Sequence, residues 1–327
     1  MTEPRGQLVG DVSEREVLSR ILRVLGGTSR AVVGPGDDAA VLAVPGERVV
    51  VSTDTLVHGP DFRLAWSSPF DLGFKAAAVN LADIAAMGAR PTALFVALAM
   101  PDSTPLTFVD DLARGLRDGC DRLAPDCAVE GGDLTASDTL TIAVTAVGVL
   151  DGRSPVLRSG ARVGDVVAVA GVLGDAARGL DLLFERFRDA GGTPIPVDLP
   201  SLDEGERALL SAQLRPEPPV RLGTGAAEAG ATAMMDVSDG LLLDATRMAE
   251  ASGVTLALDG VDDRHALRGG EDHALLATFP SHVPLPSGFR RIGEVLARDV
   301  APVLVGGRVP EGPGGWDPYR DWDAGRG

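Results

Sequence analysis

The sequence has few of the residues that bind zinc, form disulfides or build a catalytic triad. Its 327 residues include only two cysteines and four histidines. Cys120 and Cys127 have no histidine cluster beside them, so we expect two reduced, packed thiols and neither a zinc site nor a disulfide framework. The motifs GxxxxGKS/T, GxSxG and HExxH are also absent. These absences argue against a P-loop, a Ser-His triad and zinc hydrolysis.

Long hydrophobic runs and basic residues are scarce as well. The chain has no uninterrupted apolar stretch of about 20 residues, and its polar start, MTEPRGQLVGDVSER, lacks a signal-peptide core. We therefore expect a soluble, cytoplasmic protein. The 47 acidic residues against 30 basic ones give a net charge of −17, which disfavours nucleic acid and anionic membranes as partners. A polyanionic substrate would need cations to bind.

Lysine is used once, at Lys75, and arginine supplies every other basic side chain. A compact ammonium differs in geometry from a planar guanidinium, so this lysine is interpreted as retained for its shape. Lys75 lies two helical turns before Asp83, on roughly the same side of a predicted helix. One interpretation is a catalytic residue that binds phosphate or the carboxylate cluster, and the alternative is an ordinary surface lysine.

Scarce aromatics gather in the Gly/Pro-rich tail at 306–327. This tail holds Trp316, Tyr319 and Trp322, which are two of the three tryptophans and the only tyrosine. One interpretation is an anchor that packs on a domain surface. The other is a lid whose ring stacks on a flat substrate.

Periodicity and punctuation predict an α/β protein with two domains. Residues 13–27 open with a capping box and predict a helix, as does the alanine-rich stretch 71–88. Strands are predicted over residues 47–54, 92–101 and 140–150, and strand–turn–helix units over 165–187 and 231–254. The polar stretch 151–164 is the best boundary. We expect domains at 1–150 and 151–327.

Acidic residues are abundant and occur in short clusters with glycines and hydroxyls. Six of them lie far apart in the chain: GPGDD at 34–38, STD at 52–54, Asp83, GGD at 131–133, DVSDG at 236–240 and GGED at 269–272. Such oxygen ligands suit Mg²⁺. Several clusters follow predicted strands, where α/β sheets usually bind ligands. The pattern predicts a phosphate site with several metal ions.

Some of these clusters also have a structural explanation. Asp83 lies within an apolar helix, where a carboxylate is costly to bury without a cation, although it could be solvated. The glycines before Asp133 let it approach a phosphate or metal, or they form a plain turn. Asp239 could bind metal or cap the helix that follows it.

Seven motifs follow one another along the chain: GPGDDAAVL, VSTDTLVHGPDF, FKAAAVNLADIAAMGARP, VEGGDLT, LRSGARVGD, MDVSDGLLLD and LRGGEDHALL. In this order they resemble the thiamine-monophosphate kinase family over roughly residues 10–320. The parent superfamily is similar to aminoimidazole ribonucleotide synthetase. The resemblance implies two α/β domains, with ATP and Mg²⁺ in the cleft between them. It also implies a homodimer in which N-terminal strands form a barrel across the two-fold axis.

The resemblance further implies the residues of the site. The metal ligands would be Asp37, Ser52, Thr53, Asp54, Asp83, Asp133, Asp236 and Asp239. ATP would be contacted by Gly132, Asp133, Arg158 and Ser238. The substrate, thiamine monophosphate, would meet Asp61, Glu271 and Trp316. The chain departs from the family's usual pattern at Asp61, where histidine is usual, and at His273, where tyrosine is usual.

The implied reaction is ATP-dependent phosphorylation of thiamine monophosphate to thiamine diphosphate, by direct in-line transfer with several Mg²⁺ ions. One alternative is another ATP-dependent enzyme of the same superfamily, though selenophosphate synthetase is disfavoured because no cysteine lies near the N-terminus. The other is a non-catalytic nucleotide- or metal-binding regulator. The full set of carboxylates favours an enzyme.

Overall fold

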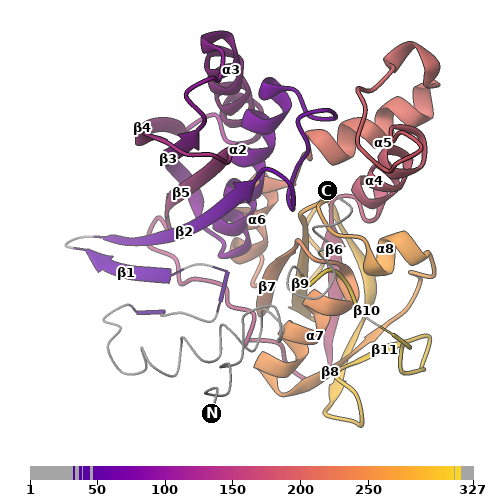
Figure 1. Cartoon of the computed structure of the whole chain (residues 1–327). Coiled ribbons are helices and arrows are strands. Elements are labelled where there is room, and N and C mark those ends of the chain that lie inside the picture. The colour runs from indigo at the N-terminus through magenta and orange to yellow at the C-terminus, as the bar shows by residue number, and fades with distance from the viewer. Residues whose placement is uncertain (1–31, 34–36, 39, 45–46, 313, 318–327) are drawn as a thin grey trace, which may run out of the picture.

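The computed structural model describes residues 32–33, 37–38, 40–44, 47–312 and 314–317. The helix predicted over 13–27 and the aromatic residues Tyr319 and Trp322 lie outside these residues. The described chain has the predicted mixed α/β architecture, built from two sheets and the helices that cover them (Figure 1).

The first sheet has the strand order β1-β2-β5-β3-β4. Its strands are β1 (Ala40–Val44), β2 (Glu47–Val57), β3 (Arg90–Met100), β4 (Ala128–Ala136) and β5 (Thr141–Val149). Only β3 and β4 run parallel, and the other neighbouring pairs are antiparallel. The predicted strands at 47–54, 92–101 and 140–150 are confirmed as β2, β3 and β5. Residues 131–133 belong to the edge strand β4, so the plain turn considered for them is wrong.

Helices α2 (Pro69–Ala86) and α3 (Leu106–Leu123) cover one face of this sheet. The N-terminus of α2 is fixed by a capping box between Ser68 and Asp71, with proline at the first helical position. The two helices approach closely, because a Cβ atom on Gly73 would lie 2.0 Å from the carbonyl oxygen of Leu112. Helix α2 is thereby confirmed as the alanine-rich helix of the sequence.

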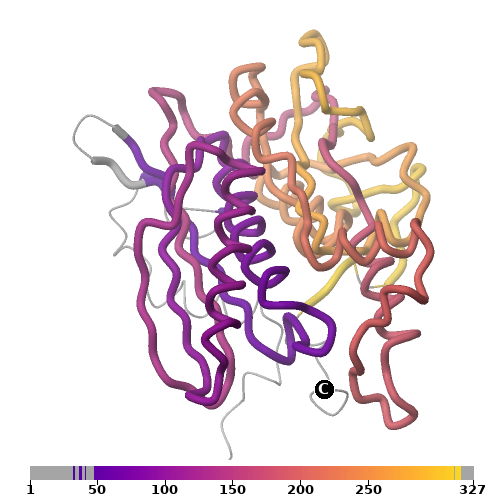
Figure 2. The backbone as a smooth tube through the Cα atoms, turned by 90° about the horizontal axis from the view of Figure 1, so that it is seen from above, coloured from indigo at the N-terminus to yellow at the C-terminus, as the bar shows by residue number. Residues whose placement is uncertain are grey.

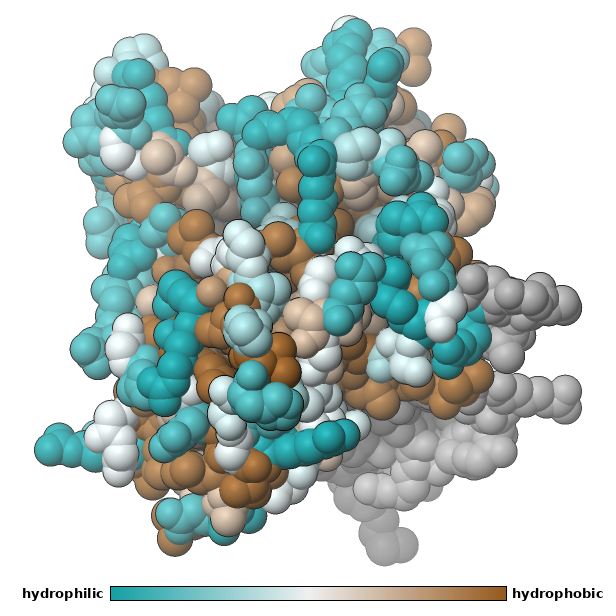
Figure 3. Space-filling model, turned by 180° about the vertical axis from the view of Figure 1, so that it is seen from behind, coloured by the Kyte–Doolittle hydropathy of each residue, from teal (hydrophilic) through white to brown (hydrophobic). Residues whose placement is uncertain are grey.

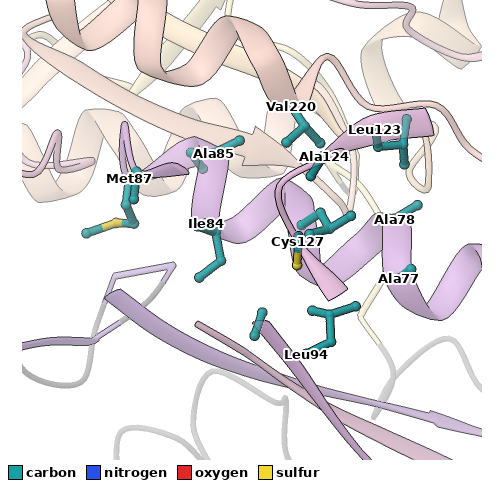
Figure 4. Close-up of a cluster of buried hydrophobic side chains, with 14 of the residues drawn as sticks. Ala77, Ala78, Ile84, Ala85, Met87, Leu94, Leu123, Ala124, Cys127 and Val220 are labelled. Carbon is teal, nitrogen blue, oxygen red and sulfur yellow. The ribbon is translucent and has the colours of Figure 1, made fainter. Parts of the chain in front are cut away.

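Because α2 is buried on nearly every side, it connects the two halves of the molecule. Figure 2 shows α2 and α3 between the first sheet and the C-terminal half. One continuous hydrophobic core joins Ile84 of α2 and Leu94 of β3 to Val220 and Met234 of the C-terminal half. Figure 4 shows part of this core, with Cys127 among its side chains. Cys120 and Cys127 are free and buried, as the sequence predicts.

The second sheet has the order β11-β8-β10-β6-β9-β7. Its strands are β6 (Asp165–Ala170), β7 (Ala233–Val237), β8 (Val254–Leu258), β9 (Ala274–Pro280), β10 (Phe289–Ala297) and β11 (Val303–Val305). Its helices are α6 (Val220–Glu228), α7 (Leu241–Ser252) and α8 (Arg264–Arg268). The strand β6 with the turn and helix α4 (Asp175–Arg186) that follow it, and β7 with its turn and α7, confirm both predicted strand–turn–helix units.

A helical pair projects beside the two sheets (Figure 1). It consists of α4 (Asp175–Arg186) and α5 (Glu204–Leu214), joined through the 3₁₀ turn η2 (Leu199–Ser201). Its small core includes Trp66 from the N-terminal half, whose indole N–H donates to the carbonyl of Phe187 at 3.0 Å. This contact ties the helical pair to the segment that precedes α2.

The described helices include none that is both long and apolar enough to cross a membrane. Seen from behind, hydrophobic residues form separate groups among hydrophilic ones (Figure 3).

Candidate active site

The first part of the site is a carboxylate cluster between β2 and α2. Alternate residues of a strand point to the same face, so Ser52 and Asp54 share the face of β2 that is turned toward α2. The Ser52 hydroxyl donates to Oδ2 of Asp83 at 2.5 Å. The same hydroxyl lies 3.1 Å from the carbonyl oxygen of Asp38. Three acidic segments that are distant in the sequence therefore meet around one serine.

Arg158 binds the carboxylates of the N-terminal segment. Its backbone N–H and its Nε donate to Asp37, each at 3.2 Å, and its guanidinium also pairs with Asp38. Both carboxylate side chains are buried. The residue predicted to contact ATP therefore joins residues 37–38 to the segment that leads into the C-terminal half.

The C-terminal half contributes Asp236 at the end of β7. The Asp236 carboxylate is buried, and its Oδ2 lies 3.0 Å from Nδ1 of His273. His273 has a left-handed backbone, with φ of 51°, and its other ring nitrogen is buried without a hydrogen-bond partner. The sequence did not predict this pairing, because it depends on the adjacent strands β7 and β9.

The loop after β7 is stabilised by a second buried carboxylate. Helix α7 begins at Leu241, and Asp239 does not cap it. Asp239 instead accepts from Arg247 at 2.6 Å, while Asp244 accepts from the same guanidinium at 2.8 Å and from two backbone N–H groups of the loop. The capping alternative for Asp239 is wrong. Asp244 and Arg247 are residues that the sequence analysis missed.

Electrostatic repulsion is strong in this cluster. Burial raises the pKa of Asp83 well above its usual value, and the carboxylates of Asp236, Asp54 and Asp38 raise it further. Burial likewise raises the pKa of Asp38, against the lowering effect of Arg158. The Asp54 residue is exposed as a whole, but its carboxylate is partly desolvated. This desolvation and the neighbouring acidic groups raise the pKa of Asp54 to about 6, although His273 lowers it. The cluster therefore favours positive charge.

The oxygen ligands of this cluster suit Mg²⁺, which keeps part of its coordination for water and substrate, better than they suit a metal ion held by protein ligands alone. Within the described ranges, no group of three His, Cys, Asp or Glu side chains is close enough to hold a metal ion by itself. Mg²⁺ commonly takes one or two carboxylates together with water and substrate phosphates. The buried Oδ2 of Asp38 has no hydrogen-bond partner, which also suits a cation. An oxygen-rich, mutually repelling cluster is thus suited to Mg²⁺ that arrives with a phosphate ligand.

Three predicted residues lie elsewhere on the first sheet. The Thr53 side chain points to the opposite face from Ser52, where its hydroxyl donates to the carbonyl of Val144 at 3.0 Å. Gly132 and Asp133 lie in the exposed edge strand β4, which β5 and β3 separate from β2. With strands about 4.8 Å apart, Asp133 is roughly 14 Å from β2 in the same chain. One chain therefore does not bring Thr53, Gly132 and Asp133 into the carboxylate cluster.

The second part of the site is a cavity of about 720 Å³ beside the cluster. Asp61, Glu271 and Trp316, the three predicted substrate residues, all line it, and so do Ser238 and Lys75. Such a volume is typical of a small-molecule site. The sequence thus predicted residues of one cavity although they lie in three distant segments.

Backbone contacts fix the walls of this cavity. The N–H of Val57 donates to Oδ2 of Asp61 at 2.7 Å. The Trp316 N–H donates to the carbonyl of Asp239 at 3.0 Å, and the Glu271 N–H donates to the carbonyl of Ser238 at 2.8 Å. The described part of the aromatic tail is therefore attached directly to the loop that follows β7. Lys75 forms an ion pair with Glu271.

Comparison with known proteins supports a common origin along almost the whole chain. The family model described as AIR synthase related protein, N-terminal domain, matches residues 36–150. The thiamine-monophosphate kinase of Mycobacterium tuberculosis is 41% identical over 331 residues, covering 95% of this chain and 93% of the relative. That of Corynebacterium glutamicum is 41% identical over 333 residues and covers 95% of each chain.

Solved structures agree with these sequence relatives. A structure of AaThiL complexed with AMPPCP and TMP has a TM-score of 0.83 at 29% identity, over 96% of this chain and 99% of that chain. Thiamine monophosphate kinase from Aquifex aeolicus has a TM-score of 0.75 at 29% identity, over 91% of this chain and 99% of that chain. With the extent of the sequence match, these findings establish that this chain belongs to the thiamine-monophosphate kinase family.

Proposed function

We propose that this chain transfers the γ-phosphoryl group of ATP directly, in line, to thiamine monophosphate, with several Mg²⁺ ions, to give thiamine diphosphate and ADP. The observation that carries the proposal is the junction of the two parts of the site. The carboxylate cluster and the cavity meet at Ser238 and Glu271. A phosphate bound at the cluster can therefore face an organic acceptor in the cavity.

The comparisons support the two substrates. Relatives of nearly full length are named thiamine-monophosphate kinase, and AaThiL was solved with AMPPCP, an ATP analogue, and TMP. The proposed reaction needs ATP and Mg²⁺ and no other cofactor. ATP as a co-substrate accounts for an acidic site that requires cations.

The chemistry suits a site without a dedicated base. A phosphate monoester has a second pKa of about 6, so near neutral pH the acceptor oxygen is already largely deprotonated. Mg²⁺ held by the cluster supplies charge neutralisation and orientation of the two anions. The protein's part is to hold Asp37, Ser52, Asp54, Asp83, Asp236 and Asp239 where those ions bind.

The cavity is suited to the organic part of thiamine monophosphate. Its acidic residues Asp61 and Glu271 attract the cationic thiazolium, and Trp316 offers a ring face for stacking and cation–π contact. Trp316 is 41% exposed, which leaves its ring surface available to a ligand. Ser238 and Arg158 are proposed contacts of ATP from the C-terminal half.

We propose that the chain forms a homodimer, and that its interface is the face of the first sheet that α2 and α3 leave uncovered. Phe95 on β3 points to this face, away from the buried Leu94 and Leu98, and is 43% exposed, which is costly in water. A second copy on this face would form the barrel of N-terminal strands and cover the strand that carries Gly132 and Asp133. These residues would then contribute to ATP and Mg²⁺ binding next to an interface. The proposed domains are residues 1–150 and 151–327.

The dimer is tested by light scattering after size-exclusion chromatography. Phe95→Asp should give a monomer, because a carboxylate would be buried in the interface. Leu106→Asp is the matched control, since Leu106 is 83% exposed on α3, on the covered side of the sheet. A monomeric wild type, or a Phe95→Asp dimer, contradicts the proposed interface.

The proposed activity is tested by following ADP release and product identity with a panel of acceptors. Thiamine monophosphate, thiamine, pyridoxal phosphate and aminoimidazole ribonucleotide are compared with and without Mg²⁺. We expect ADP and thiamine diphosphate in equal amounts when thiamine monophosphate and Mg²⁺ are both present, and no product in the other reactions of the panel. Turnover of a different acceptor would support another enzyme of the superfamily, and no turnover would support a binding protein.

Direct transfer has its own test. ATP made chiral at the γ-phosphorus should give product with inverted configuration, since one in-line displacement inverts the centre. Net retention, or a trapped phosphorylated protein, would exclude direct transfer.

A further inference from the structure

Lys75 joins three segments at the wall of the cavity. It is the only lysine of the chain, it lies in α2, and it is 4% exposed. Its Nζ forms an ion pair with Glu271 and donates to the backbone carbonyl of Gln213 at 3.3 Å, at the end of α5. The sequence analysis placed Lys75 near phosphate or the carboxylate cluster. Its contacts lie at Glu271, where the cavity meets the carboxylate cluster.

Glu271 needs support because its backbone is in an unfavourable conformation. Its φ of 73° lies in the left-handed region, which is costly for a residue other than glycine. The segment is fixed on both sides, since the Glu271 N–H donates to Ser238 and the Asp272 carboxylate accepts from the N–H groups of Gly174 and Ala176. Lys75 is the contact that fixes the Glu271 side chain itself.

The ion pair also determines the charge state of Glu271. Burial would raise the pKa of Glu271, but the Lys75 ammonium, aided by His273, lowers it below its usual value. A buried ammonium is equally costly without a partner. Each charge therefore stabilises the other, and the carboxylate stays ionised in one position at neutral pH.

We propose that Lys75 is a positioning residue for substrate binding, which holds the ionised Glu271 carboxylate at the cavity wall to receive the cationic part of the acceptor. This inference rests on the proposed function for the identity of the acceptor. Lys75 itself takes no part in the transfer of the phosphoryl group. Its loss should therefore affect the acceptor and leave ATP unaffected.

Kinetics of four variants test this role. Lys75→Met and Glu271→Gln should each raise KM for thiamine monophosphate by about 30-fold, because each leaves the other group without its partner. The kcat and the KM for ATP should stay within about twofold. The double variant should be no worse than the worse single variant, since both remove one interaction. Lys75→Arg, which keeps the charge, should recover part of the loss.

A purely structural role predicts different kinetics. Lys75→Met would then lower the melting temperature but leave KM for thiamine monophosphate unchanged in the folded enzyme. Effects of the two single variants that multiply in the double variant would also overturn the proposal. If Lys75→Met does not fold, an unchanged KM in Glu271→Gln, whose side chain is 41% exposed, overturns it as well.

The single lysine allows a test that does not require turnover. In protein labelled with ¹⁵N-lysine, NMR should give one side-chain ammonium signal, which shifts in Glu271→Gln and on addition of thiamine monophosphate. An Asp110→Asn variant, at an exposed position of α3, should leave it unchanged. Wild type without turnover would reject the proposed function alone. A signal that is identical in wild type and Glu271→Gln would reject the positioning role.

Discussion

The two parts of the site contain the same kind of residue in different electrostatic situations. In the carboxylate cluster, burial and neighbouring acids raise the pKa of Asp83, and Ser52 is its hydrogen-bond donor. In the cavity, desolvation would likewise raise the pKa of Glu271, but the Lys75 ammonium, aided by His273, lowers it. The cluster thus needs cations bound from solution, whereas the cavity already contains the Lys75 ammonium. The difference separates binding of a metal–phosphate complex from binding of an organic cation.

The largest expected effect comes from removing one charge from the cluster. Asp83→Asn keeps an oxygen that accepts from Ser52 but removes a metal-binding charge, so kcat/KM should fall about 1000-fold, or roughly 4 kcal/mol. The same variant should be more stable than wild type without Mg²⁺, by about 1–2 kcal/mol, because repulsion is relieved. Steady-state kinetics and urea unfolding measure the two effects.

Magnesium provides the control for this prediction. Mg²⁺ should raise the melting temperature of wild type and of Asp110→Asn, and should raise that of Asp83→Asn much less. Full activity in Asp83→Asn, or lower stability without Mg²⁺, would mean that Asp83 is a structural carboxylate. The comparison between cluster and cavity would then fail.

A smaller and more selective effect is expected in the cavity. Trp316→Ala removes a ring face without changing any charge, so KM for thiamine monophosphate should rise about tenfold and kcat should change little. Trp316→Phe is the matched control and should keep most of the affinity. Unchanged kinetics in Trp316→Ala would remove this residue from the site.

The last prediction concerns stability alone, at the edge strand β4. A Cβ atom on Gly132 would lie 1.9 Å from the carbonyl oxygen of Val96, so Gly132→Ala should cost roughly 2 kcal/mol of unfolding free energy. Gly225 in α6 has open space around it, and Gly225→Ala should stabilise by about 0.5–1 kcal/mol. Urea unfolding of both variants measures this. Equal effects would mean that β4 tolerates a displacement from β3.

Local features of the fold and the cavity were predictable from the sequence. The capping box and alanine spacing predict α2, and the run of valines predicts β2, because both patterns reflect packing within one segment. The cavity residues Asp61, Glu271 and Trp316 were predicted from motif resemblance, which carries information about distant contacts. Ser52, Thr53 and Asp54 were predicted as one group, yet alternation along β2 turns Thr53 to the other face.

The particular pairings between side chains of distant segments were not predictable from patterns within each segment. The order of the strands puts β4 at the edge of its sheet, so Gly132 and Asp133 lie away from Asp54 in one chain. The partners of Lys75 and Asp236 depend on how α2 and β7 pack against the loop before β9. Periodicity within a segment contains no information about such pairings.

The most direct test of the account is the position of metal in a crystal soaked with Mn²⁺, a non-hydrolysable ATP analogue and thiamine monophosphate. Anomalous scattering should locate ions within roughly 2.2 Å of carboxylate oxygens from the Asp54, Asp83 and Asp236 cluster, bridged to the phosphates. Ions bound only elsewhere, with phosphates away from these three residues, would contradict it.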